Sequence, residues 1–188
     1  MKYIYLILAL TFFLNSHAQQ VVPITTFNQG NNDGKYFKDN ENASDNFVGT
    51  WEGVTGITTF RVVLHKATMK PMGSPVQFYI DAIEGRFQII KNAGTPNEVV
   101  IHNSVKQYPT ITSFNVIFGI TYDGLGLGGD ITDTCASGGG DVLTGFFTMD
   151  IIDPNSQPVT AHWKIKSRPQ LQGEYYSVPT DIILVKVL

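Results

Sequence analysis

Cysteine is almost absent from this chain of 188 residues, and the single one is Cys135. One cysteine cannot form a disulfide within the chain, so the folded state has to be stabilised by its hydrophobic core. We interpret Cys135 as an ordinary thiol among Ser and Gly residues. A reactive thiol or an intermolecular disulfide is the alternative.

Clusters of basic residues are also missing. The 13 Lys and Arg residues are scattered singly and the net charge is −3, whereas binding to phosphate backbones requires grouped positive charge. The sequence therefore excludes nucleic acid as a partner. Hydrophobic residues make up 43% of the chain and charged residues 15%, which is typical of a globular protein and not of a disordered one.

Long apolar runs are absent except at the N-terminus. Lys2 precedes the apolar run Tyr3–Leu14, and small residues follow at Ser16 and Ala18. This pattern predicts a signal peptide over residues 1–18, cleaved after Ala18, and export to the periplasm or the medium. A membrane anchor is the alternative, but the run is shorter than the ~20 residues that span a bilayer. No transmembrane segment is expected in the mature chain.

Patterns that carry catalysis or bind metals are not found. The histidines of the mature chain, His65, His102 and His162, lie at least 37 residues apart without any close pair, so no metal site is expected. Asp81 and Glu84 form the one carboxyl pair considered for glycoside hydrolysis, which needs two carboxyl groups on either side of a substrate. We expect both residues at the end of a hairpin, where solvated carboxylates are ordinary. The sequence favours a non-enzymatic protein without catalytic residues or cofactors. An exported hydrolase stays as an alternative.

The chain is rich in residues that form strands and turns, with 18 Gly, 12 Phe and 8 Tyr. Residues 19–45 are polar turn formers and predict a solvated leader or linker. From residue 46 to 188 apolar residues recur with a period of two, which predicts one β domain with a hairpin turn at Glu84-Gly85. The nine predicted strands are Phe47–Gly53, Ile57–Ala67, Val76–Ala82, Phe87–Lys91, Glu98–Val105, Thr110–Tyr122, Val142–Ile152, Val159–Lys166 and Asp181–Leu188.

The stretch Asp123–Asp141 is glycine-rich and predicts a long loop between two strands. Its carboxylates and backbone oxygens could hold calcium, or it could cover one mouth of a barrel as a lid; a plain connection is the third possibility. Evenly spaced strands with tight turns predict an all-β antiparallel meander. We expect it to close into a lipocalin-like barrel of about 8–10 strands, with a β-sandwich as the alternative.

The motif Gly49-Thr50-Trp51 resembles the Gly-x-Trp first strand of lipocalins and related calycin barrels. That resemblance implies a structural role for Gly49 and a buried Trp51 that closes one end of the barrel. Lys186 is the nearest match to the Arg that stacks on the lipocalin Trp, and Arg168 is placed less well. The lipocalin Thr-Asp-Tyr turn and long C-terminal helix are not found.

The chain is also similar to an uncharacterised family of small exported bacterial proteins, a domain of unknown function. The matching features are the signal peptide, the polar leader, Phe-x-Gly-Thr-Trp-Glu at Phe47–Glu52, Phe-x-x-x-Leu-x-Lys at Phe60–Lys66 and the ending Pro179–Lys186. This resemblance implies no activity.

Two functions remain open for such a barrel. The first is binding of a small apolar ligand in the interior, against inward aromatic residues. The candidate residues are Phe60, Phe78, Phe114, Phe118, Phe146 and Trp163. The second is an envelope or secreted protein-interaction module with a fully packed core.

Overall fold

A computed structural model of the chain describes residues 19–104, 116–134, 136, 142–166 and 175–187. Within these residues there are eleven strands and two short 3-10 helices, and no α-helix. The elements are β1 (Gln20–Pro23), η1 (Ile24–Thr26), β2 (Lys35–Lys38), η2 (Ala43–Asn46), β3 (Gly49–Thr55), β4 (Thr58–Met72), β5 (Phe78–Lys91), β6 (Val99–Asn103), β7 (Ile117–Thr121), β8 (Gly126–Asp133), β9 (Leu143–Asp153), β10 (Thr160–Lys166) and β11 (Asp181–Val187).

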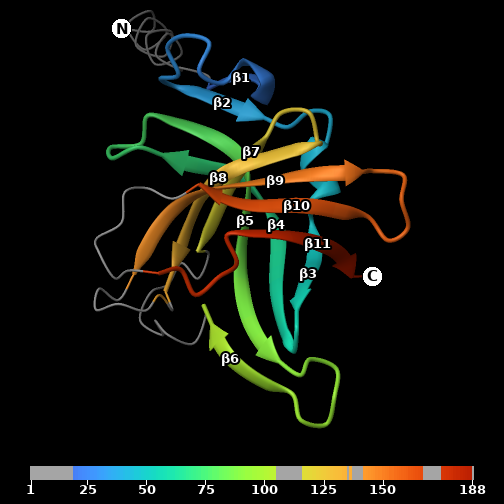
Figure 1. Cartoon of the computed structure of the whole chain (residues 1–188). Coiled ribbons are helices and arrows are strands. Elements are labelled where there is room, and N and C mark those ends of the chain that lie inside the picture. The colour runs from blue at the N-terminus through green and yellow to red at the C-terminus, as the bar shows by residue number, and fades with distance from the viewer. Residues whose placement is uncertain (1–18, 105–115, 135, 137–141, 167–174, 188) are drawn as a thin grey trace, which may run out of the picture.

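Eight of these strands close into an antiparallel barrel. Their order is β5–β4–β3–β11–β10–β9–β8–β7, and β7 returns to pair with β5. The predicted all-β barrel is confirmed, including the pairing of the last strand, β11, with β3. In Figure 1, β3, β4 and β5 run down the view while β9 and β10 cross it. β2 and β6 both pair with β5 outside the closed ring.

The strand β5 continues through the position where a hairpin was predicted. Glu84 and Gly85 lie in the middle of β5, and the prediction of a turn there was wrong. A Cβ on Gly85 would lie 2.5 Å from Leu64 Cδ2 and 2.7 Å from the carbonyl oxygen of Val63. Gly85 also pairs with Ile117, at the closure of the barrel. The glycine therefore serves close packing of strands and not a turn.

The glycine-rich stretch Asp123–Asp141 is likewise not one loop, because β8 lies inside it. β8 pairs with β7 on one edge and with β9 on the other, as a central strand of the barrel. A Cβ on Gly129 would overlap the carbonyl oxygen of Phe118 on β7, so glycine permits the close approach of the two strands. Cys135 and residues 137–141 of this stretch lie outside the described residues.

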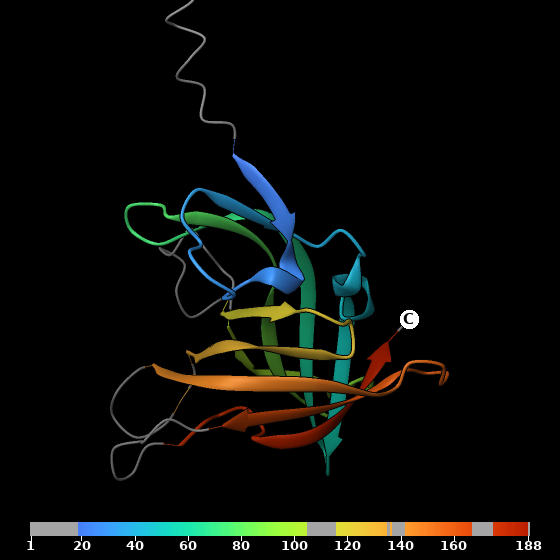
Figure 2. The ribbon, with the colours of Figure 1, turned by 90° about the horizontal axis from the view of Figure 1, so that it is seen from above.

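The segment expected to be a solvated leader contains β1, η1, β2 and η2. β1 pairs with β2, and β2 pairs with β5, both in parallel. Ile24 and Phe37 are buried against Ile80 of β5 in a second hydrophobic core. Figure 2 shows β1 and β2 on the side of the barrel away from β10 and β11. Strands of four residues are too short to reveal a period of two, which is why the sequence indicated a linker.

Trp51 on β3 is fully buried, and its indole Nε1 donates a hydrogen bond of 2.8 Å to the carbonyl oxygen of Phe47. Lys186 Nζ lies 5.4 Å from the centroid of the indole ring and donates to the carbonyl oxygen of Asn46 at 2.9 Å. A Cβ on Gly49, whose φ is +129°, would lie 3.3 Å from Lys186 Cε. Glycine thus leaves room for the lysine stem that covers Trp51.

Candidate functional site

The barrel interior is filled by aromatic rings. Phe147 stacks on Trp163 with 4.7 Å between ring centroids. Phe60 lies 5.5 Å from Trp163 and 6.1 Å from Phe87. All four rings are fully buried, and centroids at these separations belong to rings in direct contact. The space around Phe60 and Trp163 is therefore occupied by other side chains.

The other predicted ligand-binding residues do not share this interior position. Phe78 and Phe118 pack against the second core, under β1 and β2. Phe146 is 41% exposed, whereas the adjacent Phe147 points inward, because neighbouring residues of a strand face opposite sides. Phe114 lies outside the described residues. Binding of an apolar ligand by these residues stays a prediction.

A polar junction forms where β2 and β7 meet along one edge of β5. Its centre is the buried carboxylate of Asp81. Asp81 Oδ1 accepts hydrogen bonds from the Tyr36 hydroxyl at 2.6 Å and from the Met69 backbone N–H at 3.0 Å. Asp81 Oδ2 accepts from the backbone N–H of Asp39 at 3.0 Å. One carboxylate thus holds β2 and β4 together around β5.

The protonation states at the junction follow from its contacts. Burial, with the hydrogen bond and charge of Asp81, raises the pKa of Tyr36 to about 12. Burial alone would raise the pKa of Asp39, but hydrogen bonds from Ser44 and Ala43 outweigh it, and the pKa lies below its usual value. At neutral pH the phenol of Tyr36 is therefore neutral and Asp39 is ionised.

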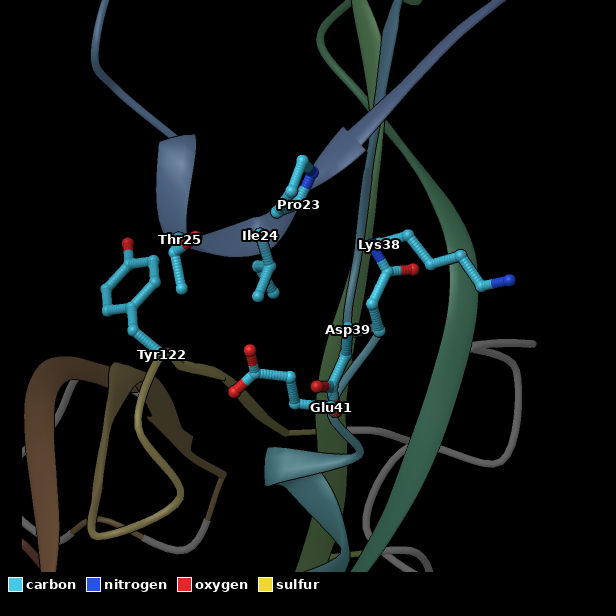
Figure 3. A pocket seen from close by; sticks show the side chains of 8 residues that line it. Pro23, Ile24, Thr25, Lys38, Asp39, Glu41 and Tyr122 are labelled. Atoms are coloured by element: carbon cyan, nitrogen blue, oxygen red, sulfur yellow. The ribbon is translucent and has the colours of Figure 1, made fainter.

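Next to this junction the surface is hollowed by a small pocket of about 90 Å³ (Figure 3). It lies between η1, the link from β2 to η2, and Tyr122 at the end of β7. The carboxylate of Glu41 extends into the space between Ile24 and Tyr122, whereas Lys38 extends away from it. Burial raises the pKa of Tyr122, so its phenol is neutral at physiological pH.

The carboxyl pair considered in the sequence is not arranged for acid–base chemistry. Asp81 and Glu84 stand three positions apart on β5 and so point to opposite faces of the sheet. Glu84 forms an ion pair with Lys70, and His65 Nε2 lies 4.0 Å from the same carboxylate. In the described part of the chain, no three His, Cys, Asp or Glu side chains are grouped to hold a metal ion.

One family model matches this chain, over residues 1–138, and its description is "Family of unknown function (DUF6705)". The chain belongs to this family. No curated protein and no solved structure matches the chain. The DUF6705 match spans β1 to β8, so every residue that lines the pocket of Figure 3 lies within it, while β9, β10 and β11 lie beyond its end.

Sequence reasoning did not find the pocket of this DUF6705 protein. Glu41 stands in a polar block that was assigned to the leader, and Tyr122 ends a strand just before a turn. The one available signal was the adjacent pair Tyr36 and Phe37, aromatic residues inside a polar segment that could dock on the domain.

The described residues contain no helix of the length and apolar character needed to cross a bilayer.

Proposed function

We propose that this protein is exported and acts as a non-enzymatic interaction module, which binds a protein partner through its surface. The filled barrel interior carries this proposal. A carrier of apolar molecules needs an internal cavity of roughly 300 Å³ or more. Instead, the rings of Phe60 and Phe147 both contact the ring of Trp163 in the buried core of the barrel.

The pocket of Figure 3 is of a size that suits one side chain. Its volume of about 90 Å³ corresponds to roughly three water molecules. The exposed Glu41 and the ionised Asp39 give the pocket a negative charge. The side chain of Lys38 extends away from the pocket and does not offset that charge. Tyr122 adds an aromatic wall, which attracts cations. We assign to this pocket the basic head group of a Lys or Arg side chain from the partner.

The assignment is tested by titrating the ¹⁵N-labelled protein with N-acetyl-lysine amide and with its uncharged norleucine analogue. We expect only the lysine derivative to move the amide signals of residues 38–41 and 122, with a Kd of about 1 mM or weaker. Glu41→Gln should abolish the effect, while Asp33→Asn, at an exposed acid outside the pocket, should leave it unchanged. Equal shifts with norleucine would overturn the assignment.

The packed core is tested separately with long-chain fatty acids. A ligand that binds the native state raises the melting temperature with its concentration, so an interior carrier would show a saturable rise in Tm. We expect no shift. Export is tested by expressing the full chain and determining the N-terminus of the protein outside the cytoplasm. We expect it to begin at Gln19.

A further inference from the structure

Gln19 would be the first residue of the exported chain, and the structure leaves space around it. β1 begins one residue later, at Gln20, and the register of β1 with β2 begins with the pair Gln20↔Lys35. Gln19 lines a broad hollow of about 670 Å³ that is open to solvent. Figure 2 shows β1 at the margin of the molecule. The side chain of Gln19 therefore has room to change its conformation.

An N-terminal glutamine carries an amine and a carboxamide that can close a five-membered ring. The α-amino nitrogen attacks Cδ of its own side chain, and the new N–Cδ bond forms as the bond from Cδ to the amide nitrogen breaks. Ammonia leaves with the proton that the amine gives up. Both groups belong to one residue, which gives them a high effective concentration, and no co-reactant is needed. Because every ring atom belongs to residue 19, β1 keeps its place while the ring closes.

We propose that Gln19 is a modification site, at which the exported chain cyclises to an N-terminal pyroglutamate. This modification rests on the proposed export with cleavage after Ala18, and it does not involve the pocket of Figure 3. The ring removes the positive charge of the terminal amine. Aminopeptidases act on chains with a free terminal amine, so the cyclised chain resists trimming into β1, whose Val22 packs against the second hydrophobic core.

The carboxylate of Asp33 opposes this reaction, but only weakly. Asp33 is exposed, and it is the one charged residue among the described residues that line the hollow. A pair with Asp33 would keep the terminal amine protonated, and only the unprotonated amine attacks Cδ. An exposed ion pair lowers the fraction of unprotonated amine by a factor of about five at most. Since ammonia is lost when the ring closes, such a pair delays the modification and does not prevent it.

The modification is tested by expressing the full chain in a bacterial host and measuring the mass of the intact exported protein without digestion. We expect the mass of residues 19–188 less one ammonia, with fragmentation that places the loss at the first residue. Gln19→Asn is the matched control, because its shorter side chain would need a strained four-membered ring, and it should keep the mass of the open chain.

Two results of this measurement overturn the modification in different ways. A wild-type protein that begins at Gln19 and keeps its full mass through prolonged incubation at neutral pH removes the modification and leaves the proposed export standing. A protein that retains residues 1–18, or that begins at another residue, removes both the proposed cleavage and the modification.

The rate of ring closure tests whether the fold leaves Gln19 as accessible as the hollow indicates. Followed by pulse labelling from the moment of export, the protein should cyclise at no less than about one fifth of the rate of a synthetic peptide of residues 19–23. Asp33→Asn should raise the rate of the protein toward that of the peptide. A wild-type rate far below one fifth of the peptide rate would show that the folded chain restrains the reacting groups, and it would overturn the proposal.

Discussion

Replacing Gly129 by alanine should destabilise the barrel far more than the same change at its neighbour Gly128. Gly129 pairs with Gly119 of β7. An added Cβ would overlap the carbonyl oxygen of Phe118 and lie 2.5 Å from the Cα of Gly119. Ordinary contact begins near 3.4 Å, so β7 would have to move by about 1 Å. Both obstacles are backbone atoms, and no side-chain rotation can relieve the overlap.

The cost follows from what such a shift disturbs. Overpacking of a core costs about 1–3 kcal/mol when side chains can adjust. Here five residue pairs join β7 to β8, from Ile117↔Ile131 to Thr121↔Leu127, and they move together. We therefore expect Gly129→Ala to lower the free energy of unfolding by about 3 kcal/mol or more.

Gly128→Ala provides the control within the same strand. Its Cβ would lie 3.3 Å from Cζ of Phe146, the half-exposed ring on β9, which can turn toward solvent. Its effect should stay within about 0.5 kcal/mol. Urea unfolding, followed by the fluorescence of the buried Trp51 and Trp163, gives both values. Equal unfolding midpoints for the two variants would refute the packing argument.

Three further predictions concern the barrel end and the junction. Trp51→Ala should lower the free energy of unfolding by about 3–5 kcal/mol. Trp51→Phe should lower it less, because this variant chiefly loses the hydrogen bond to the carbonyl oxygen of Phe47. Urea unfolding measures both variants, and unchanged stability of Trp51→Ala would contradict the structural role of the buried indole. Asp81→Asn places an amide N–H₂ among the groups that donate to Asp81 and should lower the free energy of unfolding by about 1–3 kcal/mol. Amide hydrogen exchange at residues 35–39 should become faster. Exchange unchanged from wild type would show that the carboxylate of Asp81 does not hold β2. The pKa of Asp39 is lower in the folded state than in the unfolded chain, where it is about 4. The ionised carboxylate therefore stabilises the fold at pH values above about 4, and this stabilisation is lost as the pH falls through the pKa of the folded state. The stability advantage of wild type over Asp39→Asn should therefore shrink as the pH of the urea titration is lowered below about 4, and an advantage independent of pH would contradict the assigned charge.

The alternation of apolar residues was sufficient to predict the barrel but not the continuity of its strands. Long runs such as β9 and β10 were predicted with nearly their observed bounds. Glycine was misread at Gly85 and within β8, because a glycine that marks a turn and one that permits close strand packing look alike in sequence. The distances to Leu64 and Phe118 distinguish the two cases, and they exist only after folding.

The junction was beyond prediction for a different reason. Tyr36 and Asp39 lie more than 40 residues before Asp81, and Tyr122 lies about as far after it in the chain. These segments become neighbours because β2 and β7 pair with successive parts of the same edge of β5. A period of two reveals which face of a strand is buried, but it says nothing about which strand lies beside it.

The glycines of the stretch Asp123–Asp141 and of β7 also explain why the barrel is packed. A Cβ on Gly119 would lie 2.9 Å from Cδ1 of Leu127 and 3.1 Å from Cζ of Phe147, so these two side chains occupy the room that the glycine leaves. Phe147 also stacks on Trp163 of the adjacent strand β10. The sequence pattern had placed the glycines of β8 in a loop and Gly119 on one face of a strand. In the structure they allow β7, β8 and β9 to lie close together around the rings of Phe147 and Trp163. This packing supports the proposal that a partner binds at the surface of the barrel and not in its interior.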